Sequence, residues 1–478
     1  MSSTNQSDRP IGEQTSDIVS PKQYGLPVSS ACQKLSTLDM NMPRLYAVRW
    51  ILCFSLSPSS DKAQIYETLR IGLARTLSSF PWLAGDIGPE EGHATQGNRI
   101  QIVDSIGGVN FLKKDLSSTL PTYEELQKQR FPLSVLSKAP LSPLGVMPEP
   151  PRQPVMAAQA NFIEGGLLLA LASHHSLCDA SAFHVIIRAW ADNTAAATIS
   201  KSVGAGEPIW NDRSILTGGI SGANPADFPE YILSPTPQAA TGSIPFELPP
   251  MVSRIFYFSP DSLAELKVAA GAYSTNDALS AFLWRHITIA RNPPEDCPAD
   301  AKAEEKTSSM LYAVNIRDRS NPPIPSDYTG NASMAGITNR LKISTLTSKS
   351  GLNAASTSIR ESLQVFKTPN RVQLTIGLID SRPDPTDYKL AYNGFLGPDI
   401  SFTTWSDLQV YEDFWGELLG KPEFFRMPGE GADGSVIVFP RLPATVGGGL
   451  EVMVGLELGA MERLLGNEDF QRTVKLGG

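Results

Sequence analysis

The chain has 478 residues, of which 41% are hydrophobic and 19% charged, with a formal net charge of −9 at pH 7. This length exceeds what one hydrophobic core usually organises, so we expect two domains. The acidic balance and the lack of a basic patch argue against nucleic acid and anionic membranes as partners, although a local cluster could still hold a polyphosphate.

The cysteines and the N-terminal residues bear on the compartment. Cys32, Cys53, Cys178 and Cys297 are widely spaced and form no C-x-x-C pair, so neither a disulfide framework nor a structural zinc site is expected. No apolar stretch is long enough to span a bilayer, and the polar start of the chain lacks the features of a signal peptide. We therefore expect a cytoplasmic protein with a disordered tail over residues 1–25.

The first domain is expected over residues 26–192, from the periodicity of its apolar residues. We predict strands over 46–56, 99–103 and 109–113, a helix over 61–80, a hairpin of strands 156–163 and 167–173, and a helix over 180–190. Residues 167–172 are wholly apolar, which indicates a strand buried on both faces.

Glycine and proline recur between residues 193 and 250 and interrupt any long element. We interpret this segment as a crossover linker to a second domain over residues 251–478. In that domain we predict strands over 252–258, 311–316 and 452–458, and helices over 259–270, 275–291 and 343–366, with Ser274 or Thr275 as the N-cap of the helix over 275–291.

The candidate site is His-His-Ser-Leu-Cys-Asp at residues 174–179, between the buried strand and the next helix. A lone H-x-x-x-D pattern is weak, but a rigid strand end is a common place for chemistry. Histidine, with an unperturbed pKa of about 6.5, is suited to take the proton of an attacking hydroxyl. His175 is thus a candidate base. The residues alone leave another interpretation open, in which His175 is a buried, satisfied histidine, Asp179 a helix cap and His174 a packing residue.

Further segments, together with this motif, resemble the BAHD acyltransferases, in particular the fungal branch similar to trichothecene 3-O-acetyltransferases. Residues 174–180 resemble the HHxxxDA signature of the family, and residues 80–85 its FPxLAG segment. Other segments that are similar to family landmarks, in the same order, are 35–39 with Pro43-Arg44, 274–279, 315–317, 328–331, 403–405 and 413–422.

The resemblance implies an α/β fold of two similar-sized chloramphenicol-acetyltransferase-like domains with mixed sheets. A long crossover would join them, with an active-site channel between them. It also implies direct, ternary-complex transfer from acyl-CoA, with acetyl-CoA as the expected donor, to a hydroxylated small-molecule acceptor, a secondary metabolite. His175 would be the general base, no metal or tightly bound cofactor would be needed, and the protein would be a monomer.

The resemblance also implies roles for other residues. Asp179 would point away from the reacting centre and pair with Arg317. Thr403 and Trp405 would lie near the oxyanion and the acceptor. The residues expected along the coenzyme A channel are Gly330, Asn331, Asp413 and Gly416. One departure is Trp415, which stands at the third position of the family's Asp-Phe-Gly-Trp-Gly motif. Tryptophan does not adopt a positive φ cheaply, so the loop must have a different shape.

Three competing hypotheses remain at this level. The altered Trp415 loop would suit a BAHD-fold protein that has lost acyl transfer and binds or cyclises a metabolite. Cys178, beside His175, would suit a thiol enzyme, although a small buried cysteine is commonly a core residue. A metal site formed by His174, His175 and Asp179 lacks a further cluster of ligands.

Overall fold

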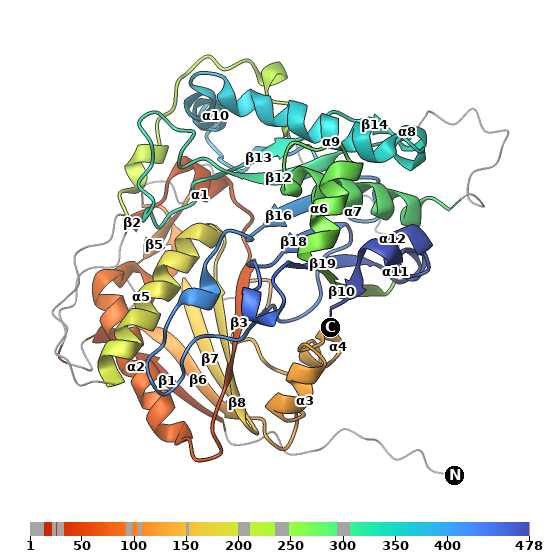
Figure 1. Cartoon of the computed structure of the whole chain (residues 1–478). Helices are drawn as coiled ribbons and strands as arrows, with labels where there is room; N and C mark the ends of the chain where they lie inside the picture. The colour runs from red at the N-terminus through yellow and green to blue at the C-terminus, as the bar shows by residue number, and fades with distance from the viewer. Residues whose placement is uncertain are drawn as a thin grey trace, which may run out of the picture.

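The computed structural model describes residues 14–21, 25, 33–91, 98–103, 108–149, 153–198, 211–234, 248–293 and 306–477. Two mixed β-sheets with helices packed on them dominate the fold, one of six strands and one of seven (Figure 1). Three smaller sheets join β2 (Gln33–Lys34), β5 (Ile100–Val103) and β4 (Asp86–Pro89); β11 (Thr307–Ser308) and β14 (Leu341–Lys342); and β15 (Tyr388–Leu390) and β9 (Tyr231–Leu233).

The six-stranded sheet has the order β1-β6-β7-β8-β3-β17, in which only the pair β6–β7 is parallel. Its strands are β1 (Gln14–Val19), β3 (Val48–Ser55), β6 (Val109–Asp115), β7 (Met156–Ile163), β8 (Gly166–Ser173) and β17 (Phe424–Arg426). Every residue of β8 is buried, as the apolar run predicted. One face carries α2 (Lys62–Ser79) and α5 (Ala180–Thr198), and the other carries α3 (Tyr123–Lys128) and α4 (Leu133–Leu136) (Figure 1).

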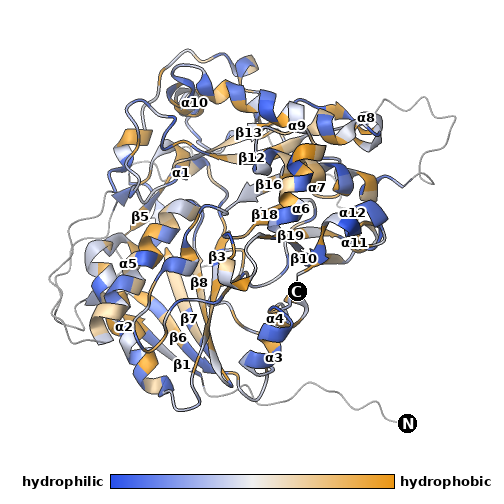
Figure 2. Cartoon of the chain, viewed as in Figure 1, coloured by the Kyte–Doolittle hydropathy of each residue, from blue (hydrophilic) through white to orange (hydrophobic). Residues whose placement is uncertain are grey.

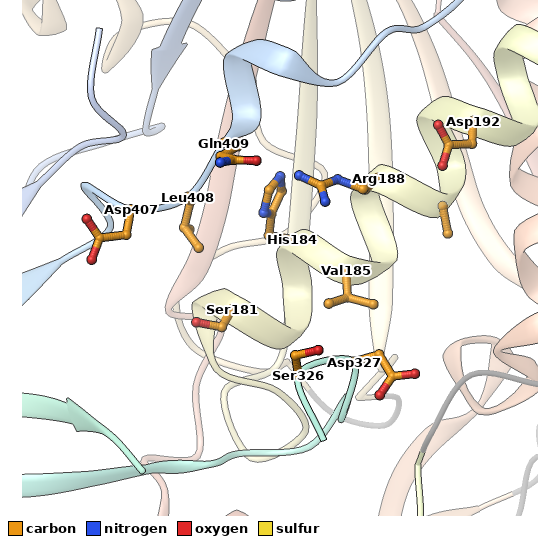
Figure 3. A pocket seen from close by; sticks show the side chains of 11 residues that line it. Ser181, His184, Val185, Arg188, Asp192, Ser326, Asp327, Asp407, Leu408 and Gln409 are labelled. Carbon is orange, nitrogen blue, oxygen red and sulfur yellow. The ribbon is translucent and has the colours of Figure 1, made fainter. Parts of the chain in front are cut away.

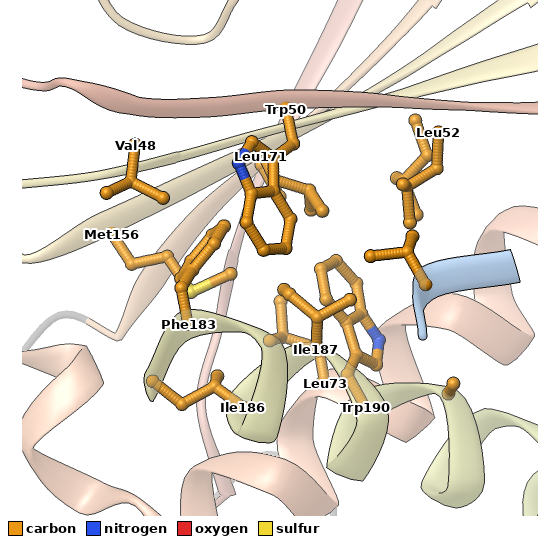
Figure 4. Packing of buried hydrophobic residues seen from close by; sticks show 14 of the residues in the cluster. Val48, Trp50, Leu52, Leu73, Met156, Leu171, Phe183, Ile186, Ile187 and Trp190 are labelled. Atoms are coloured by element: carbon orange, nitrogen blue, oxygen red, sulfur yellow. The ribbon is translucent and has the colours of Figure 1, made fainter. Parts of the chain in front are cut away.

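The core between this sheet and α5 is built from large side chains. Figure 4 shows Trp50 and Leu171 on the strands facing Phe183, Ile187 and Trp190 on the helix. Both α2 and α5 carry hydrophobic and hydrophilic residues along the same helix (Figure 2), as is typical of helices that cover a sheet. The predicted helix over 180–190 is therefore present, but it continues to Thr198.

The seven-stranded sheet has the order β13-β12-β16-β18-β19-β10-β20. Its strands are β10 (Met251–Phe258), β12 (Met310–Asn315), β13 (Ser333–Ile337), β16 (Ile400–Thr404), β18 (Ser435–Val438), β19 (Leu450–Glu457) and β20 (Lys475–Leu476). The helices of this half include α6 (Pro260–Ala269), α7 (Thr275–Arg291), α10 (Arg371–Asp380), α11 (Leu458–Leu465) and α12 (Glu468–Thr473). Ser274 caps α7 in a reciprocal pair with Asp277, as the sequence predicted.

Two predicted segments differ in the structure. Gln14–Val19 was expected in a disordered tail but forms the edge strand β1, paired with β6. The polar sequence does not predict this strand, because the strand pairs through backbone groups and only Val19 is buried. Residues 1–13, 22–24 and 26–32 lie outside the described part of the chain.

The single helix predicted over 343–366 is three elements: α8 (Ile343–Thr347), α9 (Gly351–Ser362) and the 3₁₀ helix Leu363–Lys367. The break lies at Ser348, whose hydroxyl donates to the Thr345 carbonyl. Serine and threonine side chains offer the backbone such alternatives to helical bonding, and apolar periodicity does not register them.

Of the predicted crossover, residues 193–250, the structure describes 193–198, which belong to α5, 211–234 and 248–250. Residues 211–234 contain short 3₁₀ helices at Arg213–Leu216 and Pro225–Asp227, and the strand β9. Strand β17, from the predicted second domain, completes the first sheet beside β3. The two halves are thus interlocked rather than joined at one crossing. The remaining elements are α1 (Thr37–Asn41) and 3₁₀ helices at Pro81–Ala84, Val410–Glu412 and Ala444–Val446.

Among the described residues, no helix combines the length and the apolar character that crossing a bilayer would need.

The loop after residue 412 departs from the family pattern in a way the core explains. Trp415 is fully buried, with its ring 5.8 Å from that of Phe54 and 5.5 Å from that of Trp190. The positive φ of +90° falls on Gly416, where an added Cβ would lie 2.8 Å from Oγ1 of Thr198. The tryptophan therefore fills the core, and the following glycine makes the turn.

We expect Trp415→Ala to lower the free energy of unfolding by about 3–5 kcal/mol, because it empties a fully buried aromatic site. The adjacent Phe414 is 42% exposed, so Phe414→Ala is the matched control and should change it by less than about 1 kcal/mol. Urea denaturation followed by fluorescence measures both. Equal losses would contradict the assignment of Trp415 to the core.

Candidate active site

The motif loop, residues 174–179, connects the end of β8 to the start of α5. Its backbone is held from three sides. The amide of His174 donates to the Val155 carbonyl (3.1 Å), that of His175 to the Leu45 carbonyl (2.8 Å), and that of Leu177 back to His174 (3.1 Å). The loop is therefore a rigid turn whose position is set by segments before β3 and β7.

His175 is partly exposed, and its two ring nitrogens have different surroundings. Nδ1 is buried without a hydrogen-bond partner among the described residues, whereas Nε2 is not fully buried. Burial holds the pKa of His175 below its usual 6.5, against the opposing effects of its own carbonyl and the Asp179 charge. The imidazole is thus neutral at neutral pH, with Nε2 as the nitrogen available to a substrate.

His174 is a packing residue in the structure, as one sequence interpretation held. It is fully buried, its Nδ1 accepts from the Ser176 amide (3.2 Å), and its ring meets that of Tyr46 edge-on at 5.3 Å. Burial lowers its pKa to about 3, with smaller contributions from His175 and Arg44. It is therefore neutral at neutral pH.

Asp179 and Arg317, which the resemblance paired, form a buried bidentate ion pair. Nη1 of Arg317 lies 3.0 Å from Oδ2 of Asp179 and Nη2 lies 3.2 Å from Oδ1. The amide of Ala182 also donates to Oδ1 and that of Ala332 to Oδ2, both at 2.8 Å. The carboxylate is saturated, so it caps α5 and ties it to the second half of the chain instead of reaching a substrate or a metal ion.

A second buried carboxylate, Asp39, was not recognised from the sequence as part of the site. It is fully buried at the start of α1 and pairs with Arg213 from the crossover segment, with Nη1 2.8 Å from Oδ2. The only local signal is Ser36 three residues earlier, which forms a reciprocal cap with Asp39. Such a cap accounts for an acidic residue without any functional role, and it conceals the long-range pairing.

The residues expected near the oxyanion lie on and just after β16. Thr403 pairs with Ile437 of β18 and is partly exposed. Trp405 is 9% exposed, with its ring 5.9 Å from both Trp50 and Phe425. Trp405 therefore belongs largely to the core of the first sheet, whereas Thr403 is partly exposed.

The structure divides the four residues expected along the coenzyme A channel into two groups. Gly330 and Asn331 lie beneath the motif loop, where the Asn331 amide group donates to the His175 carbonyl (2.9 Å). Asp413 instead accepts from Nε2 of His184 (2.9 Å) and Nε of Arg188 (3.1 Å), farther along α5. Gly416 packs against the C-terminal end of the same helix.

Two open cavities flank the segment 406–409. One, of ≈490 Å³, lies between this segment, α5 and residues 326–327 (Figure 3). Figure 3 shows His184 and Arg188 on α5 facing the chain that carries Leu408 and Gln409. The other, of ≈500 Å³, lies between the segment and residues 441–443. His175 lines neither of these two cavities.

The competing chemistries find little support in the local geometry. Cys178 is fully buried, and burial raises the pKa of its thiol to about 12, so it is not a thiolate at neutral pH. Within the described ranges no group of three or more His, Cys, Asp or Glu side chains is placed to hold a metal ion.

Comparison with known proteins places this site in context. The model of the Transferase family matches residues 13–470. The acyltransferase easC of Emericella nidulans is 30% identical over 94% of this chain and 96% of its own. The eremophilane O-acetyltransferase ORF8 of Penicillium roqueforti is 28% identical over 92% and 98%. The structure of TRI101, the trichothecene 3-O-acetyltransferase of Fusarium sporotrichioides, with coenzyme A and T-2, superimposes with a TM-score of 0.78 at 25% identity, over 94% of this chain and all of the other.

We expect Asp179→Ala to lower the free energy of unfolding by about 3–5 kcal/mol, because Arg317 would be left as an unpaired buried charge. Asp469→Ala is the control, since Asp469 and Arg472 form a pair that is 70% and 71% exposed, and such a pair contributes at most about 1 kcal/mol. Chemical denaturation measures both. A stable Asp179→Ala protein that binds both substrates but does not turn over would instead give Asp179 a direct catalytic role.

Proposed function

The chain belongs to the Transferase family, the BAHD acyltransferases, and from this premise we propose that it transfers an acyl group, acetyl in the first instance, from acyl-CoA to a hydroxyl of a secondary metabolite, with His175 as the general base. The observation that carries the proposal is the place of His175 at a rigid strand end, partly exposed and with Nδ1 buried. Burial lowers the pKa of the imidazole, which suits it to accept a proton at neutral pH.

The proposed reaction takes place in a ternary complex. Nε2 of His175 takes the proton of the acceptor hydroxyl while its oxygen attacks the thioester carbonyl. The tetrahedral oxyanion then collapses, the carbon–sulfur bond breaks, and the departing thiolate takes the proton back from the imidazolium. Asp179 takes no part in this proton transfer, because its oxygens are held by Arg317 and two backbone amides.

The other site residues have supporting roles in this proposal. The hydroxyl of Thr403 is the candidate donor to the oxyanion, and Trp405 supports it from the core. Gly330 and Asn331 are buried beneath the motif loop, so they would act on coenzyme A only through the position of that loop. Asp413 and Gly416 would act on coenzyme A through the shape of the loop they anchor against α5, since the Asp413 carboxylate is already paired with His184 and Arg188.

The relatives support the choice of donor and acceptor. TRI101 has been solved with coenzyme A and T-2, and the Penicillium roqueforti relative is named for O-acetylation of an eremophilane. A hydroxylated secondary metabolite is thus the acceptor class that we propose here.

The alternative, a protein that has lost acyl transfer, rested on the unusual Trp415. That residue packs against Phe54, which pairs with Leu167 at the far end of β8 from the motif loop. Its substitution therefore alters the core at a distance from His175 and gives no reason to expect loss of the reaction.

We expect His175→Ala to lower kcat by about 10²–10⁴-fold, the usual contribution of a positioned general base. Cys178→Ala is the matched control from the same loop and should keep most of the activity. Release of free thiol from acetyl-CoA, measured with a panel of hydroxylated terpenoids, polyketides and alkaloids, reports both. No release by the wild-type protein with any acceptor would favour the non-acylating alternative, and an equal loss in Cys178→Ala would favour a thiol mechanism.

The pH dependence tests the same base independently. A protonated imidazole cannot accept a proton, so kcat/KM should fall as the pH drops through the pKa of His175. Because burial lowers that pKa, the midpoint should lie below 6.5 and the activity should be level near neutral pH. A pH–rate profile with a midpoint well above 7 would indicate a different base.

A further inference from the structure

We propose that Asp39 is a positioning residue for the reaction, which holds His175 in its working orientation through two bridging side chains, Asn331 and Arg213. The inference rests on the proposed role of His175 as the base. Asp39 makes no hydrogen bond to the imidazole among the described residues. Its charge is the last of the causes that raise the pKa of His175, and its contacts reach His175 through the backbone of the motif loop.

The first bridge is Asn331. Oδ1 of Asp39 accepts from the backbone amide and from Nδ2 of Asn331, both at 2.8 Å. The same Nδ2 donates its second hydrogen to the carbonyl of His175 at 2.9 Å. A side-chain amide has two N–H groups, and both are used here, one towards the buried carboxylate and one towards the catalytic residue.

The second bridge is Arg213, which connects the other carboxylate oxygen of Asp39, Oδ2, to the motif loop. Its Nη1 donates to Oδ2 of Asp39 and to the carbonyl of Leu177, both at 2.8 Å. Arg213 is 3% exposed, and its guanidinium lies over the ring of Trp82 at 5.0 Å. Asp39 itself is fully buried, so each member of the pair neutralises a charge that would be costly alone.

The two bridges therefore hold the carbonyls of residues 175 and 177, one on each side of Ser176. This matters for the imidazole, because Nδ1 of His175 is buried and has no side-chain acceptor among the described residues. Backbone groups of His175 and Cys178 favour the protonated imidazole, so the motif-loop backbone lies close to the ring. Holding the His175 carbonyl fixes the backbone from which the imidazole projects, and so limits the directions that its ring can take.

Asp39 and Asp179 hold different parts of the motif loop. Asp179 anchors its C-terminal end at α5, whereas Asp39 anchors its middle. Successive backbone amides connect the two, since that of Asn331 donates to Asp39 and that of Ala332 donates to Asp179, both at 2.8 Å. A substitution of the Asn331 side chain should therefore affect His175 without disturbing the pairing of Asp179.

The sharpest test is Asn331→Leu, which removes the donor to the His175 carbonyl but keeps a side chain of similar size and the backbone bond to Asp39. We expect kcat to fall by about 10²-fold, the effect of a slightly misdirected catalytic group. The KM of the acceptor and the Kd of coenzyme A, measured by calorimetry, should stay within twofold. Loss of coenzyme A affinity in proportion to kcat would make Asn331 a substrate contact and overturn the proposal.

Arg213 provides a second test with a conservative rescue. Arg213→Lys keeps the charge and donors that can reach Asp39 and Leu177, so it should keep more of the kcat than Arg213→Met. The control for loss of a buried arginine is Arg426→Met, because Arg426 pairs with Glu451 at 0% exposure of both side chains but lies in β17, and Glu451 keeps Arg130 as a second partner. It should lower the melting temperature and leave kcat unchanged. Equal kcat values for the lysine and methionine variants would contradict the positioning role.

His175→Ala, assayed in parallel, separates this inference from the function on which it rests. Turnover that survives His175→Ala would overturn the proposed function and the inference with it. An inactive His175→Ala beside an Asn331→Leu whose kcat stays within twofold of wild type would leave the function standing and overturn only the positioning role.

Discussion

The site depends on two buried carboxylates that are each neutralised by an arginine and filled with backbone hydrogen bonds. Asp179 ends the six-residue motif loop and Asp39 is buried beneath it, and neither is exposed enough for water to take the place of a missing partner. A buried charge left unpaired costs several kcal/mol, whereas a complete network is tolerated. The loop is therefore held in one arrangement, because any arrangement that leaves one of these carboxylates without its arginine is less stable than the one that pairs both.

This constraint makes the site a product of both halves of the chain. Asp39 and the motif loop come from the first half, Arg213 from the crossover, and Arg317 and Asn331 from the second. No half can place His175 alone, because each carboxylate finds its arginine beyond the first domain. The strand β17, which returns from the second half to complete the first sheet, adds to the same interlocking.

The surrounding apolar core provides the rigidity that this polar network requires. Strand β8 is buried along its whole length. The motif loop follows directly from its end and leads into α5, so the position of the strand fixes the start of the loop. Trp50, Phe183 and Trp190 fill the space between sheet and helix, and Trp415 closes the far end of that space. An unusual residue in a family motif thus alters core packing at the end of β8 that lies opposite the motif loop.

The sequence by itself determined the elements whose side chains repeat with a period, together with the motif that they carry. The strands and helices around residues 46–80 and 156–190 were predictable because one face of each is apolar, and the resemblance paired Asp179 with Arg317. Tertiary structure alone decided the edge strand β1 and the pairing of Asp39 with Arg213. These depend on backbone groups or on single polar contacts between distant segments. Burial of a face leaves a local pattern in the sequence, whereas a contact between residues 174 positions apart leaves none.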